Sequence, residues 1–325
     1  MRYRMFGRTG WKVSEIGFGG WGMGGGWGQR DDAEAMRALR RALELGVNFF
    51  DTAYVYGNGH SEKLLGEALR SWKEPVFVAT KVPAKTMEWP ATPKTPIAQA
   101  FPVDWTIQCA ELSLKRLGLE RIDLLQFHVW TDAWVQAEEW RRAVERLKRE
   151  GKIRAFGVST NDHEPDSVLK LTATGQIDSV QVIYNIFDQT PERALFPLCR
   201  EHGVAVIARV PFDEGSLTGA LTPQSRFHQE DWRKGYFRDG RLAETCQRVE
   251  RLKGFLRPGS DSLPALALKF ILASSVVSTV IPGMRRISHV EANCSVSDEK
   301  GLEPDEWKRL KEHAWPRNFY VGAWD

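Results

Sequence analysis

Short runs of β-branched and aromatic residues alternate with longer stretches of helical periodicity along almost the whole chain, and this alternation limits the possible folds more than any other feature. The short runs lie at residues 15–20, 47–52, 76–81, 122–128, 153–158, 179–184, 204–209 and 276–281. The helical stretches lie at 31–45, 60–71, 104–118, 134–150, 164–173, 192–202 and 240–256, with a short one after Pro282 and a last one at 303–314. Such alternation predicts a parallel sheet, and eight units in one chain favour a closed (β/α)8 TIM barrel over an open sheet.

Segments outside this pattern are expected at the two ends of the barrel. Residues 3–6 and 12–15 flank the turn at 7–10, which predicts an N-terminal β-hairpin that plugs the bottom. Insertions at 83–103 and 212–239 each follow a strand, so both are expected as long loops on the opposite, active face. An aromatic tail either folds back over that face or contacts another subunit; it contains Trp307, Trp315, Phe319, Tyr320 and Trp324.

Size and charge favour a globular enzyme over a binder of nucleic acid or membranes. No linker divides the 325 residues, so we expect a single barrel domain over 1–325. The formal net charge is only +3, with 45 Lys and Arg against 42 Asp and Glu, which provides no field that favours polyanionic partners. The start of the chain lacks the apolar core of a secretory signal, and no run approaches the roughly 20 apolar residues of a membrane span. We therefore expect a cytoplasmic protein, while the oligomeric state stays open.

The cysteines are expected to be reduced core thiols. They form no CxxC pair and no zinc-finger spacing, and they are Cys109, Cys199, Cys246 and Cys294. No H-x-H or other dense ligand cluster accompanies them, so we expect no metal site, and a metal-dependent hydrolase is the least favoured function.

Four polar residues follow three successive apolar runs. Asp51 ends the run at 47–52 and Tyr56 lies five residues further on, whereas Lys81 and His128 end the next two runs. A parallel sheet gathers the C-terminal ends of its strands on one face, so these four side chains are expected to converge on one pocket.

These residue types together suit the reduction of a carbonyl, which requires a hydride at carbon and a proton at oxygen. An unperturbed tyrosine, with a pKa of about 10, is a weak acid. A cation such as Lys81 near the phenol would lower that pKa, and Asp51 would hold the ammonium in place. We expect Tyr56 as general acid, Lys81 and Asp51 as the pair that tunes it, and His128 as the donor that orients the carbonyl. Each residue alone is more often structural, so the expectation rests on their joint placement.

The order and spacing of the four residues resemble the aldo-keto reductase family of NAD(P)H-dependent carbonyl reductases. The likeness covers almost the whole chain and includes Asp51-Thr52-Ala53, Tyr56-Gly57, Ser61-Glu62, Leu64, Leu65, Gly66, Lys81, His128, Gly157-Val158-Ser159, Gln181, Leu217-Thr218-Gly219 and Ile281-Pro282-Gly283. The resemblance implies a TIM barrel, a nicotinamide cofactor and a small carbonyl or alcohol substrate.

The resemblance also implies which residues bind the cofactor. Ser159, Thr160 and Gln181 would hydrogen-bond the nicotinamide carboxamide, although the family usually has Asn where Thr160 stands. Asn161 follows at once, but a shift of one residue reverses side-chain direction along a strand. Arg209 replaces an aromatic residue that stacks on the nicotinamide, and its guanidinium is expected to stack there or to reach a phosphate. The other expected cofactor residues are Gly20, Trp21, Asp51, Val210, Pro211, Phe212, Ser216, Gly219, Gly283, Arg285, His289 and Asn293.

The segment after Pro282 bears on the choice of cofactor. A helix starting there would aim its first amides and the side chains of Arg285 and Arg286 at an anion, which suits a 2′-phosphate. NADP(H) is therefore expected in preference to NAD(H), which stays possible. Only Asn293 carries over from the family's usual adenine contacts, because Ala292 stands where Glu is frequent.

Parts of the sequence also fit three other interpretations. Residues 20–25 imitate the Rossmann fingerprint G-x-G-x-x-G, with Asp51 after the next strand. More glycines and Trp27 precede the helix expected near Asp31, so no helix N-terminus would receive a pyrophosphate, and a pocket wall is favoured instead. Lys81 could alternatively form the Schiff base of an aldolase. The chain could also be a cofactor-sensing regulatory subunit, as some proteins that resemble this family are.

Aromatic residues are expected to form much of the substrate pocket, because an indole offers a large flat face suited to an apolar or sugar-like molecule. The expected pocket residues are Trp21, Tyr56, Trp89, His128 and Trp130. The substrate itself and the physiological direction of the reaction stay open.

Overall fold

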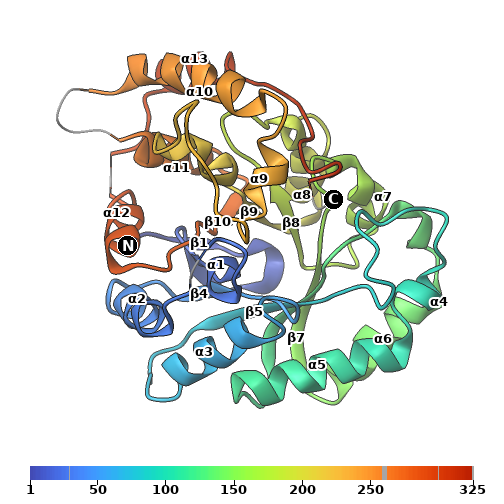
Figure 1. The fold of residues 1–325 in the computed structure, drawn as a ribbon. Coiled ribbons are helices and arrows are strands. Elements are labelled where there is room, and N and C mark those ends of the chain that lie inside the picture. Colours follow the sequence, from blue (N-terminus) through green and yellow to red (C-terminus); the bar gives the residue numbers. More distant parts are fainter. Residues whose placement is uncertain (29, 258–261, 299, 324–325) are drawn as a thin grey trace.

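The strands form one curled sheet around the core (Figure 1). The computed structural model describes residues 1–28, 30–257, 262–298 and 300–323, and within these ranges one sheet has eight parallel strands. They are β3 (Phe18–Gly19), β4 (Phe49–Asp51), β5 (Phe77–Val82), β6 (Ile122–Phe127), β7 (Ile153–Ser159), β8 (Ser179–Ile183), β9 (Ala205–Arg209) and β10 (Val277–Val280). Each of them falls within, or overlaps, a predicted run.

Hydrogen bonds between the two ends of the sheet close it into a barrel. The Gly17 N–H donates to the Val280 carbonyl over 2.8 Å, and the Gly19 N–H donates to the Pro282 carbonyl over 3.0 Å. Strands β3 to β10 otherwise pair in parallel with their neighbours in chain order. The predicted (β/α)8 TIM barrel is therefore confirmed.

The predicted N-terminal hairpin covers the bottom of the barrel. Strand β1 (Tyr3–Met5) pairs antiparallel with β2 (Lys12–Ser14). Phe6 and Trp11, at the connecting turn, stack with ring centroids 5.6 Å apart, and Phe6 also packs on Phe49 at the start of β4. The hairpin thus covers the bottom of the barrel with apolar side chains, and the opposite end is not covered by it.

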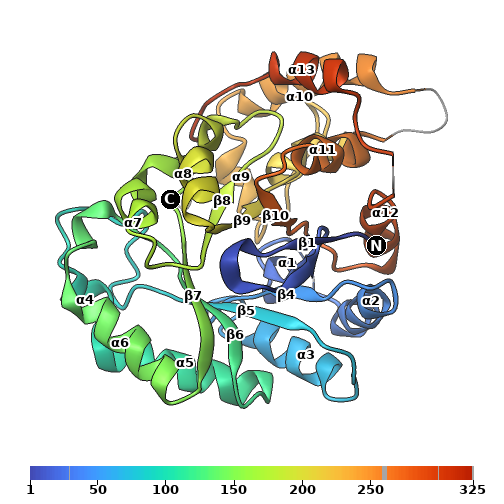
Figure 2. The same ribbon diagram turned by 180° about the vertical axis from the view of Figure 1, so that it is seen from behind.

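Helices surround the barrel, as the view from behind also shows (Figure 2). Those of the surrounding ring are α2 (Asp32–Glu44), α3 (His60–Leu69), α5 (Val103–Leu117), α6 (Glu138–Arg149), α7 (Leu169–Ala173), α8 (Leu195–His202), α11 (Leu263–Leu272) and α12 (Ile287–Cys294). Outside the ring, α10 (Arg241–Leu252) and α13 (Pro304–Lys311) lie beside each other in both views. Short helices in the loops are α1 (Trp21–Gly24), α4 (Ile97–Ala100) and α9 (Arg233–Tyr236).

Helix α11 is absent from the elements that the periodicity predicts. It is apolar on almost every side, so it carries no amphipathic pattern, and most of its side chains are buried. Helix α11 directly precedes β10, whereas the periodicity predicts α10 as the last helix before that strand. Because α10 is strongly amphipathic, it can lie outside the ring with its polar face in solvent.

The inward-facing residues of the strands change from apolar to polar along the barrel axis. Phe49 and Ala79 belong to the apolar cluster that includes the hairpin plug. Two residues further along the same strands come Asp51 and Lys81, which are also buried. Since side chains on a strand alternate between its two faces, both pairs point into the barrel, and the charged pair lies toward the active face.

The C-terminal tail folds back over the active face, one of the two arrangements that the sequence left open. The Asn318 amide donates to the Asp162 carbonyl over 3.2 Å. Tyr320 donates a hydrogen bond to Glu214 in the loop after β9. Trp324, also assigned to this tail, lies outside the described residues.

Neither membrane-spanning helices nor disulfides are found in the part of the chain that the structure describes. No helix there has both the length and the apolar character that a bilayer crossing requires. Cys109, Cys199 and Cys294 are buried and Cys246 is partly exposed, and all four are unpaired.

Candidate active site

Lys81 connects two of the predicted catalytic residues at the C-terminal end of the barrel. Its Nζ atom donates to Asp51 Oδ1 over 2.5 Å and to the Thr52 carbonyl over 2.8 Å. A longer contact of 3.4 Å reaches the Tyr56 hydroxyl. The Lys81 and Asp51 side chains are 1% and 3% exposed, so solvent screens the pair only weakly. Residues from two strands and a loop thus form one contact group.

The second carboxylate oxygen of Asp51 is held from across the barrel. Gln126 on β6 and Gln181 on β8 donate to Asp51 Oδ2 over 3.3 and 2.8 Å. With both oxygens bound, the carboxylate is fixed in orientation, and so is the ammonium of Lys81. Gln126 is not among the predicted site residues, although its position two residues before His128, on the same inward-facing row, could have indicated it.

His128 lies beside this group, between two aromatic rings. Its imidazole is 5.8 Å from the Tyr56 ring at 70° and 5.1 Å from the Trp89 ring at 90°. Burial, reinforced by the charges of Lys81 and Arg209, holds the pKa of His128 well below its usual range. The ring is therefore neutral at pH 7, with one N–H to donate and one bare nitrogen.

Tyr56 keeps its proton at neutral pH. Burial raises the pKa of its phenol above the usual value, and the charge of Lys81, which acts in the opposite direction, does not outweigh it. This differs from the expectation that Lys81 lowers the pKa overall. The lysine instead limits a rise that burial alone would make larger.

The loop that carries Tyr56 is supported by a buried ion pair. Arg116 on α5 donates to the Tyr54 carbonyl over 3.2 Å and to Glu62 on α3 over 3.1 Å. Glu62 is fully buried, and its other oxygen accepts a hydrogen bond of 2.7 Å from the Thr80 hydroxyl. Arg116 is not among the predicted site residues, because nothing in the sequence of its helix distinguishes it from a surface arginine.

Gly20 and Trp21 pack against the end of β4. The Gly20 N–H donates to the Asp51 carbonyl over 2.8 Å, and a Cβ atom at Gly20 would lie 2.8 Å from that oxygen. The Trp21 ring lies 6.4 Å from the Tyr56 ring and 5.4 Å from the Trp232 ring. These glycines belong to a closed barrel, and only the one-turn helix α1 overlaps them, so the Rossmann interpretation is excluded.

The residues expected around the nicotinamide gather at the ends of β7 and β8. Ser159 is buried at the end of β7, and the Thr160 N–H donates to the Gln181 carbonyl over 2.9 Å. The Thr160 hydroxyl is buried without a protein partner among the described residues. Asn161 turns toward the loop after β5, where its side chain exchanges hydrogen bonds of 3.0 and 3.1 Å with the backbone of Ala91. Its amide is thus used within the protein and does not replace the family's usual Asn.

Arg209 contacts two residues of the loop after β7, which lie far from it in sequence. Its Nη2 atom lies 2.7 Å from Asp162 Oδ1 and donates to the Thr160 carbonyl over 3.2 Å. Asp162 in turn accepts a hydrogen bond of 2.6 Å from the Trp89 indole. The guanidinium thus contacts the loop after β7 through Nη2, whereas its buried Nε has no protein partner among the described residues, and its role toward the cofactor stays a prediction.

The loop after β9 carries several predicted cofactor residues and is tied to the C-terminal tail. Val210, Asp213 and Glu214 adopt positive φ angles of 55°, 47° and 54°, which non-glycine residues rarely do. The Ser216 hydroxyl donates to Asp213 over 2.6 Å, and Asp213 also binds Arg317 of the tail. Directly along this loop lie the expected cofactor residues Val210, Pro211, Phe212, Ser216 and Gly219.

Positive side chains gather after β10, where an anion was predicted to bind. Burial and the charges of Arg286 and Arg233 lower the pKa of Arg285. Burial and the charges of Arg286 and Arg285 lower the pKa of His289. Such mutual effects among cations mark a region of positive potential.

A carboxylate already lies at the start of α12. Glu34 on α2 accepts a hydrogen bond of 3.1 Å from the Ile287 N–H. Space is nonetheless open beside Gly283, where a Cβ atom would have no neighbour within 4 Å. Asn293 on α12 is buried, and its Nδ2 atom has no protein partner in the described ranges.

The predicted pocket residues separate into two groups. Trp21 and Trp89 contact Tyr56 and His128 respectively. Trp130 is fully buried, so the prediction that it lines the substrate pocket is wrong; its ring packs among Phe127, Trp134 and Trp140.

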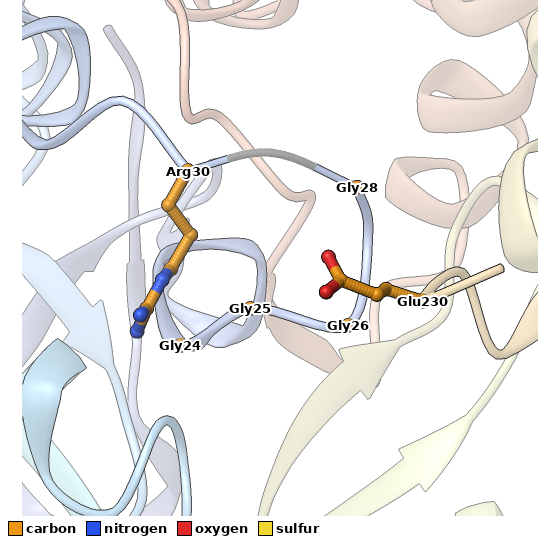
Figure 3. A pocket seen from close by; sticks show the side chains of 6 residues that line it. All are labelled: Gly24, Gly25, Gly26, Gly28, Arg30 and Glu230. Atoms are coloured by element: carbon orange, nitrogen blue, oxygen red, sulfur yellow. The ribbon is translucent and has the colours of Figure 1, made fainter. Parts of the chain in front are cut away.

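A pocket of about 550 Å³ opens beside the Tyr56 loop (Figure 3). Its lining comes from the glycine-rich segment after β3 and from the loop after β9, and consists of Gly24, Gly25, Gly26, Gly28, Arg30 and Glu230. A Cβ atom at Gly24 would lie 2.6 Å from the backbone of Tyr56, so the pocket and the Tyr56 loop share a wall. Arg30 and Glu230 place opposite charges on different sides of this opening, and neither residue was predicted.

Comparison with known proteins identifies the class. Residues 15–314 match the aldo/keto reductase family. The chain is 30% identical over 298 residues to aldo-keto reductase YhdN from Bacillus subtilis, which covers 90% of this chain and 87% of that protein. The holo structure of aldo-keto reductase AKR11C1 from Bacillus halodurans superimposes with a TM-score of 0.76 and 29% identity, covering 98% and 97% of the two chains. Glycerol dehydrogenase AKR11B4 from Gluconobacter oxydans gives a TM-score of 0.77 and 26% identity over 96% and 94%.

The chain belongs to the aldo/keto reductase family, whose members are oxidoreductases that act on carbonyls and alcohols with nicotinamide cofactors.

Proposed function

We propose that this protein is an NADP(H)-dependent oxidoreductase that interconverts an aldehyde or ketone and the corresponding alcohol. The contact group of Lys81, Asp51 and Tyr56 beside a neutral His128 carries this proposal. A buried cation next to a protonated phenol stabilises phenolate as it forms. A neutral imidazole beside them can donate a hydrogen bond to an oxygen without adding charge.

In the direction of reduction, Tyr56 gives its proton to the carbonyl oxygen as that oxygen gains negative charge. Lys81 stabilises the phenolate that remains, and Asp51 keeps the ammonium in place. His128 donates its N–H to the same oxygen and orients the carbonyl. In the direction of oxidation, the phenolate of Tyr56 takes the proton of the alcohol, since the same groups must serve both directions.

The bound nicotinamide cofactor supplies or accepts the hydride. Ser159, Thr160 and Gln181 are suited to its carboxamide, and Asn293 is suited to its adenine. The unpartnered Thr160 hydroxyl and Asn293 amide support this assignment, because buried polar atoms in proteins nearly always have partners. A cofactor that runs from the end of β7 to α12 would satisfy both atoms.

The preference for NADP(H) rests on the positive region around Arg285 and Arg286. The relatives do not decide the matter, since one from Escherichia coli is named NADH-specific methylglyoxal reductase and one from Schizosaccharomyces pombe carries NADP(+) in its name. In this chain the negative charge of Glu34 opposes the arginines. We propose that the arginines prevail, because a 2′-phosphate can bind their donors directly.

Transfer of a label from the cofactor tests the proposed reaction. With NADPH carrying deuterium at both C4 positions of the nicotinamide, deuterium is expected on the carbinol carbon of the product whichever face delivers the hydride. The reaction is run with aromatic aldehydes, dicarbonyls and sugars, and the products are examined by mass spectrometry. Alcohol products without deuterium would contradict hydride transfer from the cofactor.

A regulatory subunit with little turnover is the second candidate. The chain is 30% identical over 318 residues to a probable voltage-gated potassium channel subunit beta from Arabidopsis thaliana. Tight binding of NADPH, together with very slow turnover of every carbonyl in the panel, would favour this candidate over the reductase.

A Schiff-base aldolase is less favoured. Lys81 is fully buried, and its amine is engaged by Asp51 and the Thr52 carbonyl, whereas a Schiff base requires an accessible, neutral amine. Borohydride added with substrate is expected to leave the mass of the protein unchanged.

A further inference from the structure

Four side chains from four separate segments form a continuous series that ends at His128. Arg209, at the end of β9, lies 2.7 Å from Asp162 in the loop after β7. Asp162 accepts a hydrogen bond of 2.6 Å from the indole of Trp89 in the loop after β5. The Trp89 ring meets the His128 ring edge-on at 5.1 Å. The series therefore connects a residue assigned to the cofactor with one assigned to the carbonyl.

Asp162 is the fixed point of this series. Each of its carboxylate oxygens has one strong donor, Oδ1 from Arg209 and Oδ2 from Trp89. Its backbone carbonyl accepts from Asn318 of the C-terminal tail over 3.2 Å. The side chain is only 8% exposed, and hydrogen bonds to a charged acceptor are stronger than neutral ones. The carboxylate is thus oriented by β9 and by the loop after β5 at once.

Trp89 depends on this hydrogen bond for its position. It is 41% exposed and belongs to a long loop, so packing alone restrains its ring poorly. Asn161, next to Asp162, and Ala91, two residues after Trp89, form a second connection between the same two loops. The loop after β7 therefore holds the loop after β5 at two points, of which Asp162 fixes the aromatic ring itself.

We propose that Asp162 is a positioning residue, anchored by Arg209, that holds Trp89 against His128 and thereby sets the direction of the imidazole N–H toward the carbonyl oxygen. The proposal rests on the function proposed above. The rings of Tyr56 and Trp89 both contact the ring of His128, and Trp89 lies closer, so a displaced indole removes a contact that restrains the imidazole. Arg209 is then part of the support of the carbonyl pocket.

A double-mutant cycle of Trp89→Phe and Asp162→Asn tests the proposal. Trp89→Phe keeps an aromatic ring beside His128 but removes the indole N–H. Each single variant is expected to lower kcat for a small aldehyde about tenfold. Asp162→Asn, which changes no proposed pocket residue, is expected to leave KM and the Kd of NADPH unchanged within about twofold, since orientation in the transition state is lost and not binding. The double variant is expected to lose no more than the worse single variant. Losses that multiply to about a hundredfold would overturn the proposal.

Asp123→Asn is the matched control. Asp123, at the start of β6, forms a 2.8 Å ion pair with Arg154 at the opposite end of the barrel. The Asp123→Asn variant is expected to keep the wild-type kcat, even if its melting temperature is lowered as much as that of Asp162→Asn. A kcat that decreases in parallel with melting temperature in both variants would reduce Asp162 to a structural role and overturn the proposal.

A second readout does not depend on turnover. The indole N–H resonance of Trp89, assigned by its loss in Trp89→Phe, is expected to shift and to exchange faster with solvent in both Asp162→Asn and Arg209→Met. A resonance that stays unchanged in both variants would overturn the proposal. This readout distinguishes failure of the proposed function from failure of the positioning role of Asp162. A wild-type protein that is inactive on every carbonyl would contradict the proposed function, and the resonance would still report on the link between Asp162 and Trp89.

Discussion

Gln181 on β8 donates a hydrogen bond of 2.8 Å to the Oδ2 atom of Asp51 on β4. The two strands are not neighbours in the sheet, so this contact crosses the interior of the barrel. Asp51 is also the carboxylate that holds Lys81. If Gln181 binds the nicotinamide carboxamide as proposed, one glutamine connects the cofactor with the groups that transfer the proton.

Replacing Gln181 by Leu is therefore expected to have two effects. Asp51 loses a buried donor, which should lower kcat about tenfold, and the cofactor loses a contact, which should raise its Kd. Gln126→Leu removes the other donor to the same oxygen, at 3.3 Å, without touching a proposed cofactor residue. It is expected to lower kcat and leave the Kd unchanged in a fluorescence titration with NADPH. Equal Kd values for wild type and Gln181→Leu would contradict the proposed carboxamide contact.

The pH dependence of carbonyl reduction follows from His128 and Tyr56. Burial and nearby cations hold the pKa of His128 well below its usual range, so the ring stays neutral from about pH 6 upward. Burial raises the pKa of Tyr56, so the phenol stays protonated up to about pH 10. We expect kcat/KM for an aldehyde to be flat between about pH 6 and pH 9 and to fall at higher pH as Tyr56 loses its proton. A loss of activity centred near pH 7 would show that one of the two groups titrates there.

Glu34 provides a test of cofactor choice. Its carboxylate lies at the first amide of α12, so a 2′-phosphate bound there as proposed would be repelled, whereas NAD(H), which lacks this phosphate, would be affected less. Glu34→Gln is expected to increase the preference for NADPH over NADH roughly fivefold at low salt. Glu291→Gln removes an exposed carboxylate of the same helix that is paired with Arg41, and should leave the ratio of the two Kd values unchanged. An unchanged ratio in Glu34→Gln would mean that the phosphate does not bind near this amide.

Glu214 is expected to make the protein less stable at alkaline pH. Burial raises its pKa to about 8, so between about pH 4.5 and pH 8 the folded state binds a proton that the unfolded state has released. Stability therefore falls as pH rises through this range, by about 1.4 kcal/mol for each pKa unit of the shift at most. Glu214→Gln is neutral at every pH and should be more stable than wild type at pH 9, as measured by urea denaturation. The same difference between the two proteins at pH 6 and at pH 9 would rule out Glu214 as the titrating group.

The barrel could be predicted because each strand is a short apolar run bounded by turn residues. Such a run can be recognised from the local sequence, without knowing which strands pair with it. Helix α11 could not, because a helix that is buried on nearly all sides loses the polar face on which the periodic signal depends. Asp51, Lys81 and His128 could likewise be predicted to lie together, since the C-terminal ends of parallel strands share one face of the sheet.

The errors and omissions in the site have equally local causes. Trp130 was placed in the pocket because an indole offers a large flat face, but its ring is fully buried and uses that face to pack among Phe127, Trp134 and Trp140. Asp162 was missed because its partners, Arg209 and Trp89, come from segments far apart in sequence, and no local pattern marks such a contact.

The most direct test of the central claim is the rate of NADPH oxidation with a good aldehyde substrate in wild type, Tyr56→Phe and Tyr54→Phe. Tyr54 is the matched control, since it lies on the same loop but its ring packs against Trp105 and Arg116, and its contact with Lys81 is a backbone hydrogen bond that Tyr54→Phe keeps. We expect Tyr56→Phe to lower kcat by a factor of about 10² to 10⁴, as loss of a general acid does, and Tyr54→Phe to stay within a few-fold of wild type. A Tyr56→Phe variant that keeps most of its turnover would contradict the assignment of Tyr56 as the proton donor.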